Sequence, residues 1–337
     1  MLLKIGCAFL LAFTIYAQED ERYYNTKNEH GDTPLHIAAR NGNDFITNLL
    51  LINGANVSIV NEEGNTPLHL AVINNNINTI KLLIKHGANP NLKNEEGKDP
   101  FFMMVSAEHT NLDVLELFLD NGAFVDSTDS NGDTALHLAV SSSNVEMINL
   151  LLARGADAIL NLPNAAGNTP LHLLVRDEGF EDILELFVKQ GVNTNAKDKD
   201  GNTLLHITSW YGNLNSSKLL IEYFVPVNIQ NNDGNTPLYL AIWNGNSDLV
   251  RLLLDNGATI NHVNKEGSTP LHDAVTHKKR YLIQMLLDHG ANDKAVDKNG
   301  NLALHLAMIN NDTVIAENLI NFNSRNKNII LDYQEDP

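Results

Sequence analysis

The sequence predicts an all-α repeat solenoid of stacked helix–turn–helix–hairpin repeats, and three observations support this fold class. The residues Gly64-Asn65-Thr66-Pro67-Leu68-His69-Leu70-Ala71 recur in related form along the chain. The copies begin near residues 31, 64, 97, 132, 167, 201, 234, 267 and 300, so the period is 33 to 35 residues, which is typical of repeat architectures. Apolar residues follow each copy at helical spacing. A single repeat cannot bury its apolar face, so the repeats are expected to stack.

The first 17 residues are predicted to be a signal peptide. Lys4 precedes an apolar run that ends at Ala17, and Gln18 begins a polar stretch, which is the pattern of a secretory leader cleaved near Ala17. The run is too short to span a membrane comfortably. We therefore expect a secreted or periplasmic protein with no stable membrane insertion after cleavage. The alternatives are a lipid attached to Cys7 and a buried N-terminal strand.

Residues 18–30 are expected to be a linker and N-terminal cap, and residues 31–321 are expected to be the repeat domain. In the second repeat, Gly64 suits a tight turn with positive φ. Thr66 suits a helix N-cap, and Pro67 fits the first helical position. Gly87 is expected to end the second helix. The positions expected to be apolar are Leu68, Leu70, Ala71 and Val72 in the first helix, then Ile77, Ile80, Leu82, Leu83 and Ile84 in the second, with a hairpin over 88–96.

Several repeats depart from this pattern. The third repeat lacks the motif histidine and adds two residues around 108–110, the fourth adds two over 159–164, and the fifth adds one near Glu178. The sixth has Phe224 where other repeats have glycine, and the seventh has Tyr239 in place of histidine. Residues 322–337, which follow the last repeat, are expected to be a C-terminal cap or tail.

The TPLH core and the 33-residue period resemble the ankyrin repeat family over roughly Glu29 to Asn321. This resemblance implies a non-catalytic module that binds a protein partner. It implies that recognition uses the concave face, through hairpin tips and the outward side of the first helices. It also implies that the motif histidine bonds to backbone groups and to the motif threonine.

Seven histidines occupy the motif, one in each of seven repeats. Side chains on neighbouring repeats lie about 10 Å apart, so three of them cannot surround one metal ion. We therefore expect a structural role and no metal. The seven residues are His36, His69, His137, His172, His206, His272 and His305.

Composition and motifs exclude several classes of function. The formal charge of −18 disfavours nucleic acid and anionic membranes as partners, because binding to phosphate needs clustered lysine and arginine. No phosphate-binding loop, nucleophile elbow or zinc-protease motif occurs. Because the repeats use nearly the whole chain, we expect no enzyme, no catalytic residues and no cofactor. A hydrolase with an unrecognised site is the least favoured alternative.

The strongest functional signal is aromatic. The positions seven and eight residues after each motif threonine close the first helix, and both tryptophans of the chain fall at the first of these positions in adjacent repeats. Exposed Trp, Tyr and Arg side chains commonly anchor interfaces. The predicted partner-binding residues are Trp210, Tyr211, Trp243, Asn244, Arg176, Asp177, Asn202, Asn235 and His277. The polar rim is expected at the hairpin tips, including Lys199, Asp200, Asn232, Asp233, Lys265 and Glu266.

Two other interpretations of these aromatic residues are open. The rings could pack on each other and on Pro237 as local core, or they could stack on a sugar. The sequence as a whole indicates a monomeric adaptor or effector that binds a protein partner, with a periplasmic inhibitor of an enzyme or toxin as the alternative. Asn56, Asn215 and Asn311 lie in glycosylation sequons, which the abundance of asparagine explains by chance.

Overall fold

The computed structural model describes residues 23–106, 110–155 and 159–332. The predicted signal peptide and residues 18–22 of the linker lie outside these ranges. The chain forms two compact units, residues 1–159 and 160–337. The boundary falls inside the predicted repeat domain 31–321, next to the connection that the sequence lengthens by two residues. We refer to the two parts as the N-terminal and C-terminal units and describe each by itself.

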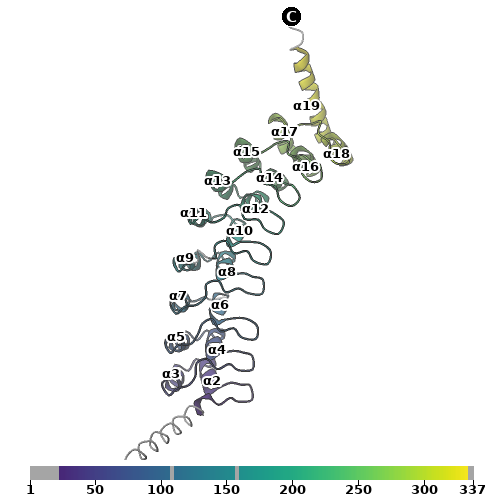
Figure 1. The fold of residues 1–337 in the computed structure, drawn as a ribbon. Helices are drawn as coiled ribbons and strands as arrows, with labels where there is room; N and C mark the ends of the chain where they lie inside the picture. The colour runs from purple at the N-terminus through teal and green to yellow at the C-terminus, as the bar shows by residue number, and fades with distance from the viewer. Residues whose placement is uncertain (1–22, 107–109, 156–158, 333–337) are drawn as a thin grey trace, which may run out of the picture. The chain divides into compact units, whose positions relative to one another are not determined.

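The N-terminal unit stacks helix pairs in which a first and a second helix lie antiparallel (Figure 1). First helices contact first helices of the next pair, as α2 contacts α4, and second helices contact second helices, as α3 contacts α5. Its helices are α2 (Pro34–Arg40), α3 (Asp44–Ile52), α4 (Pro67–Ile73), α5 (Ile77–Lys85), α6 (Pro100–Val105), α7 (Leu112–Asp120), α8 (Ala135–Ser141) and α9 (Val145–Ala153).

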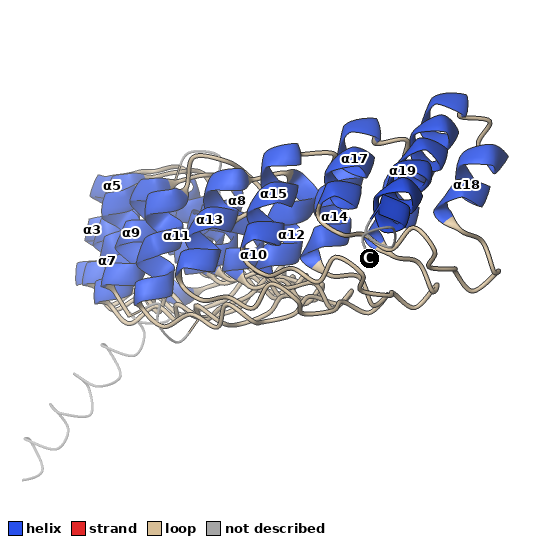
Figure 2. Cartoon of the chain, turned by 90° about the horizontal axis from the view of Figure 1, so that it is seen from above, coloured by secondary structure: helices blue, strands red, loops and turns tan. Residues whose placement is uncertain are grey.

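The C-terminal unit repeats the same arrangement, with long loops on one side of its helices (Figure 2). First helices α12, α14, α16 and α18 contact one another in sequence. Its helices are α10 (Pro170–Leu174), α11 (Glu181–Lys189), α12 (Leu204–Tyr211), α13 (Leu214–Glu222), α14 (Pro237–Asn244), α15 (Ser247–Asp255), α16 (Pro270–Thr276), α17 (Arg280–Asp288), α18 (Ala303–Ile309) and α19 (Thr313–Asp332). Within the described residues the chain has no strand, and all-helical repeats are confirmed as the fold class.

The motif residues start the first helices as predicted. The Thr66 hydroxyl accepts the His69 backbone N–H at 3.4 Å, and Pro67 occupies the first turn of α4. In the third repeat, Asp99 takes over the N-cap and accepts the Phe102 N–H at 2.8 Å. A side chain that accepts these otherwise unpaired amides stabilises a helix by about 1 kcal/mol.

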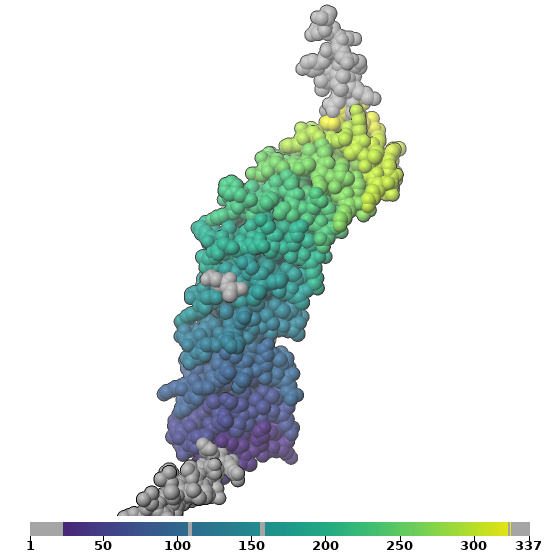
Figure 3. Space-filling view, in the orientation of Figure 1, coloured from purple at the N-terminus to yellow at the C-terminus, as the bar shows by residue number. Residues whose placement is uncertain are grey.

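The apolar core of each unit lies between successive helix pairs, and the side chains close into a continuous surface over each unit (Figure 3). In the second repeat, Leu68, Leu70, Ala71, Val72, Ile80, Leu83 and Ile84 are buried as the spacing predicts, whereas Ile77 and Leu82 are only half-buried. Buried alanines such as Ala71 and Ala241 leave room for neighbouring first helices to approach closely.

The hairpins are closed by one side chain that the sequence repeats. Asn231 Oδ1 accepts the N–H groups of Asp233 and Asn235, both at 3.0 Å, and Asn231 Nδ2 donates to Asn202 Oδ1 of the preceding hairpin at 2.9 Å. An Asn or Asp stands three residues before each motif glycine. One polar side chain therefore closes its own turn and, in this case, joins the turn to its neighbour.

Two local departures change the regular pattern. Phe224 adopts φ +59° at the position where Gly87 and Gly257 both have φ +84°, and its side chain is 92% exposed. At the C-terminus, α19 continues to Asp332, so the predicted boundary between residues 321 and 322 falls inside a helix.

Candidate functional site

The motif histidines connect one repeat to the next. In the sixth repeat the Thr203 N–H donates to His206 Nδ1 at 3.2 Å, and His206 Nε2 lies 3.0 Å from the Asn235 carbonyl oxygen. His36, His69 and His272 make the same bridge, to the carbonyls of Asn65, Lys98 and Asn301. His305, in the last repeat, is exposed. Six of the seven side chains are buried, as a structural role predicts.

This geometry fixes the protonation state of the buried rings. Because Nδ1 accepts an N–H, the proton must sit on Nε2, where it donates to the carbonyl. A second proton on Nδ1 would point at the threonine N–H, which is itself a donor, so the hydrogen bond would be lost. Burial lowers the pKa of His206 to about 4, and it also lowers the pKa values of His36, His69 and His172. These imidazoles are neutral at physiological pH.

Tyr239 replaces the histidine in the seventh repeat and keeps the bridge to the next one. Its hydroxyl hydrogen-bonds with the carbonyl of Ser268, which is the position that receives the histidine bridge elsewhere, and lies 2.7 Å from the His262 carbonyl. Burial raises the pKa of the Tyr239 hydroxyl. The contact between the motif residue and its own threonine is lost in this repeat, and the buried Thr236 hydroxyl has no hydrogen-bond partner among the described residues.

An aromatic row crosses three consecutive first helices of the C-terminal unit. The ring centroids of Trp210 on α12 and Trp243 on α14 lie 5.0 Å apart with an edge-to-face inclination. The His277 ring lies 4.7 Å beyond Trp243. Each tryptophan remains 44% exposed. The rings therefore pack on each other, as one alternative expected, but they also present a large apolar surface to solvent.

An open groove of about 370 Å³ lies beside this row. Trp210, Tyr211 and Trp243 line it from the helices, together with the aliphatic side chains of Ile207 and Leu240. These aliphatic residues lie one turn before the tryptophans, on the same helix face.

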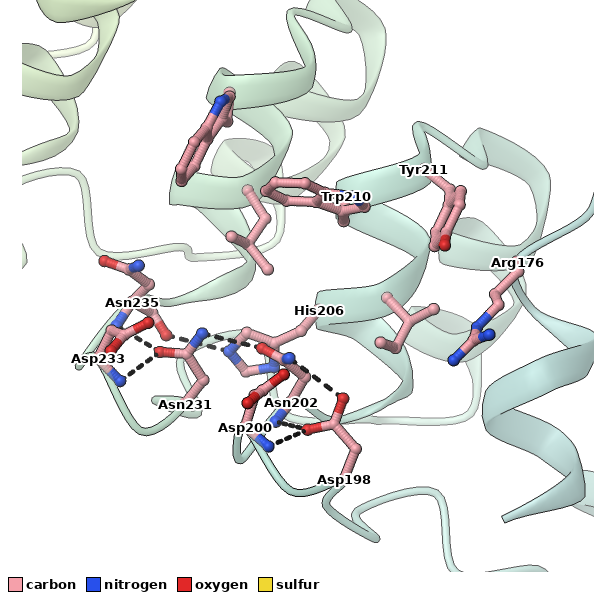
Figure 4. Close-up of a pocket in the computed structure, with 13 residues that line it drawn as sticks. Arg176, Asp198, Asp200, Asn202, His206, Trp210, Tyr211, Asn231, Asp233 and Asn235 are labelled. Atoms are coloured by element: carbon pink, nitrogen blue, oxygen red, sulfur yellow. Dashed lines mark hydrogen bonds between the residues drawn. The ribbon is translucent and has the colours of Figure 1, made fainter. Parts of the chain in front are cut away.

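Polar side chains from two hairpins line the opposite side of the groove, and Arg176 lies at the end near Tyr211 (Figure 4). The Nε of Arg176 is buried and has no hydrogen-bond partner within the described part of the chain. The hairpin residues are Asp198, Asp200, Asn202, Asn231, Asp233 and Asn235.

A family model described as ankyrin repeats matches residues 6–94, 102–198, 171–264 and 243–330, which is most of the sequence. The chain belongs to the ankyrin repeat family. Ankyrin repeats generally act as non-catalytic protein–protein interaction modules. A search of curated proteins finds no match.

The described part of the chain holds neither a metal-ligating cluster nor a helix suited to crossing a membrane. Among the described residues, no three His, Cys, Asp or Glu side chains gather closely enough to hold a metal ion. No helix in the described ranges combines the length and the apolar character needed to cross a membrane.

The ankyrin fold brings most of the predicted site residues together. Arg176, Asn202, Trp210, Tyr211, Asn235 and Trp243 all line the groove. Asn244 and His277 lie next to it, because Asn244 Nδ2 donates to the Trp210 carbonyl at 3.0 Å and His277 contacts Trp243. Asp177 is exposed and does not line the groove.

Asn202 and Asn235 have structural bonds that the sequence analysis missed. Asn202 Oδ1 accepts from Asn231 Nδ2, and Asn235 Oδ1 accepts from Asn264 Nδ2, both at 2.9 Å. The Oδ1 atom of each amide is thus used within the hairpin network, and Asn202 Nδ2 also donates to Asp198 Oδ2 at 3.2 Å. The signal was present in the sequence as the Asn or Asp three residues before each motif glycine.

Asp273 is a second feature that the sequence analysis missed. It stands four residues after the motif threonine, where the two preceding repeats have Ile207 and Leu240. Its side chain is half-buried, and burial raises the pKa of its carboxyl to about 6, while the nearby His277 lowers it. A carboxyl at an apolar position of α16 therefore interrupts the aliphatic line under the aromatic row.

Proposed function

We propose that this ankyrin protein is a non-catalytic adaptor or effector that holds a protein partner in the groove over α12 and α14. The observation that carries the proposal is the placement of Trp210 and Trp243. They are the two tryptophans of the chain, they occupy the same position in adjacent repeats, and they border the groove with 44% of their surface exposed. Large amphipathic rings that stay accessible next to a concave site are typical anchors of protein interfaces.

Site-specific crosslinking tests this proposal. A photo-crosslinking side chain introduced at Tyr211 should capture a partner in the producing cell, and the same side chain at Ile73 should not. Ile73 is a fair control because it also closes a first helix and is exposed, but belongs to the N-terminal unit. Equal capture from both positions, or capture from Ile73 alone, would place the binding site elsewhere.

A double substitution then measures how much the rings contribute. Trp210→Ala with Trp243→Ala should weaken binding of the crosslinked partner by at least about a hundredfold, since interface tryptophans each contribute about 2 kcal/mol or more. Ile73→Ala with Ile309→Ala, at the matching position of other repeats, should leave binding unchanged. If the tryptophan variant loses its helical circular dichroism, the rings belong to the core and the site is wrong.

We also propose that the protein works outside the producing cytoplasm, as a monomer. The basic start and apolar run of residues 1–17 support export. The first ankyrin match begins at residue 6, which would instead make part of this segment a repeat. Mass spectrometry of the exported protein separates the two: a new N-terminus near Gln18 supports export by cleavage, and an intact Met1 contradicts it.

A further inference from the structure

We propose that the occupant of the groove is an extended segment of the partner protein that presents one lysine or arginine side chain to Asp200 and Asp233. This inference rests on the proposed function and adds the chemistry of the ligand. The stem of the basic side chain would lie along the tryptophan rings, and its charged head would reach the hairpin carboxylates on the opposite side of the groove (Figure 4).

The carboxylates of Asp200 and Asp233 are available for such a ligand. Both side chains are exposed, line the groove, and have no hydrogen bond or ion pair among the described residues. Asp198, by contrast, accepts the N–H groups of Asp200 and Asn202 and is part of the hairpin. Two unpaired carboxylates on adjacent hairpin tips favour a cation between them, because charge-assisted hydrogen bonds are the strongest that exposed groups make.

The neighbouring lysines do not neutralise this site. Lys199 lies on the same hairpin as Asp200, and Lys265 lies on the hairpin after that of Asp233, but neither lines the groove. Lys279 is turned toward the Asn244 carbonyl oxygen, 3.4 Å from its Nζ. The groove therefore keeps a negative wall, in keeping with the formal charge of −18 for the whole chain.

The aromatic wall favours the same class of ligand. A cation within about 6 Å of an indole centroid is attracted by the negative ring face, and the attraction is larger for Trp than for other side chains. The aliphatic stem of Lys or Arg can at the same time cover apolar surface. Trp210 and Trp243 meet edge to face and remain partly exposed, so ring surface is open to the groove.

Arg176 limits the ligand to a single basic side chain rather than a basic run. It lies at the end of the groove beside Tyr211, and its buried Nε has no partner within the described residues. A second cation at this end would be repelled, whereas a peptide carbonyl would satisfy the guanidinium. First helices lie about 10 Å apart, so an extended segment spans α12 and α14 with about three residues.

Calorimetry and fluorescence with short peptides test the proposal. The probes are acetyl-Gly-Leu-Arg-Leu-Gly-amide and its forms with Gln or Glu at the centre. The arginine peptide should bind at least about tenfold more tightly than the glutamine peptide, since a charge-assisted hydrogen bond and a cation–π contact are both lost. Binding should change the tryptophan emission, which reports on this groove because the chain has no other tryptophan.

The matched variants are charge-equivalent. Asp200→Asn with Asp233→Asn should reduce binding of the arginine peptide to the level of the glutamine peptide. Glu63→Gln with Glu96→Gln should keep it within about twofold, because these residues hold the same tip position in the N-terminal unit and change the net charge equally. Circular dichroism would show that both variants keep their helices.

Four results would overturn the inference. They are equal binding of the glutamine and arginine peptides, equal weakening by both pairs of substitutions, binding that leaves tryptophan emission unchanged, and equal binding of spermidine, a polyamine without a peptide backbone. None of these removes the proposed function, which stands or falls on the crosslinking from Tyr211. If no peptide binds at all while that crosslinking succeeds, the groove holds a partner of different chemistry.

Discussion

At the scale of single residues, the motif histidine acts as a neutral bridge between repeats. Its Nδ1 accepts from its own helix start, and its Nε2 donates to a carbonyl of the next repeat, as His206 does with Thr203 and Asn235. The residue is repeated because each interface needs one such donor and acceptor in the same place. A metal ion would compete for both nitrogens.

Loss of this bridge should lower the free energy of unfolding strongly only in an internal repeat. We expect His206→Ala to lower the free energy of unfolding by about 2–4 kcal/mol, because it leaves the Thr203 N–H and the Asn235 carbonyl unpaired in a buried site. His305→Ala, in the last repeat, should cost less than about 1 kcal/mol because that ring is exposed. Urea unfolding measures both, and equal losses would contradict the bridging role.

Asp273 should make stability depend on pH in a definite direction. Its folded pKa of about 6 lies above the ordinary 3.8, so the folded state holds the proton more tightly than the unfolded state. The ionised carboxyl therefore destabilises the fold at neutral pH, and this penalty shrinks as the pH falls below 6 and is lost only below the unfolded pKa of 3.8. Asp273→Asn should raise the free energy of unfolding by about 1–3 kcal/mol near pH 8 and by less than about 1 kcal/mol near pH 4.

Thermal unfolding at the two pH values measures this difference between Asp273→Asn and the unsubstituted protein. The buried histidines act in the opposite sense on both proteins: His206, with a folded pKa of about 4, contributes stability above pH 6.5 that is lost as the pH falls. The comparison cancels this effect. A stabilisation by Asp273→Asn that is equal at both pH values would contradict the raised pKa.

Phe224 occupies a backbone conformation that suits glycine. At φ +59° its backbone is strained, and the side chain, with 92% exposure, gains little from packing. We expect Phe224→Gly to stabilise the protein by about 0.5–1 kcal/mol. Phe124 is also exposed but does not have a positive φ, so Phe124→Gly should destabilise the protein instead. Denaturant unfolding distinguishes the two, and a loss of stability in Phe224→Gly would show that the ring makes contacts.

At the scale of elements, side-chain hydrogen bonds hold the hairpins in place, where paired strands would use a ladder of backbone hydrogen bonds. Asn231 closes its own turn and reaches the preceding hairpin at Asn202. Hydrogen bonds of this kind hold Asp200 and Asp233 on adjacent hairpins at the edge of the groove. The geometry of the proposed cation site therefore depends on residues that would not touch the ligand.

Removal of one such side chain should loosen its hairpin. We expect Asn231→Ala to destabilise the protein by about 1–2 kcal/mol and to speed hydrogen exchange at the Asp233 and Asn235 amides, which lose their acceptor. Asn299→Ala, at an exposed hairpin tip, is the control and should change neither quantity. Unchanged exchange in Asn231→Ala would mean that the backbone alone holds the turn.

At the scale of the whole molecule, the sequence predicted the scaffold more completely than the site. The helices and their core could be derived from the sequence alone, because the periodicity, the N-cap at Thr66 and the helix start at Pro67 are local features. The groove combines side chains from three repeats, and its charge depends on which carboxylates the hairpins already use. Counting from the motif threonine found Trp210 and Trp243, but it could not show that Asn202 and Asn235 are bound within the scaffold.

The central claim is that the partner binds in the groove bordered by Trp210 and Trp243. The most direct measurement is tryptophan emission during titration with the partner captured from Tyr211, because both tryptophans of the chain border this groove. We predict a saturable change in emission whose midpoint equals the dissociation constant from calorimetry, and its loss in Asp200→Asn with Asp233→Asn. Tight binding of that partner with no change in tryptophan emission would contradict the account.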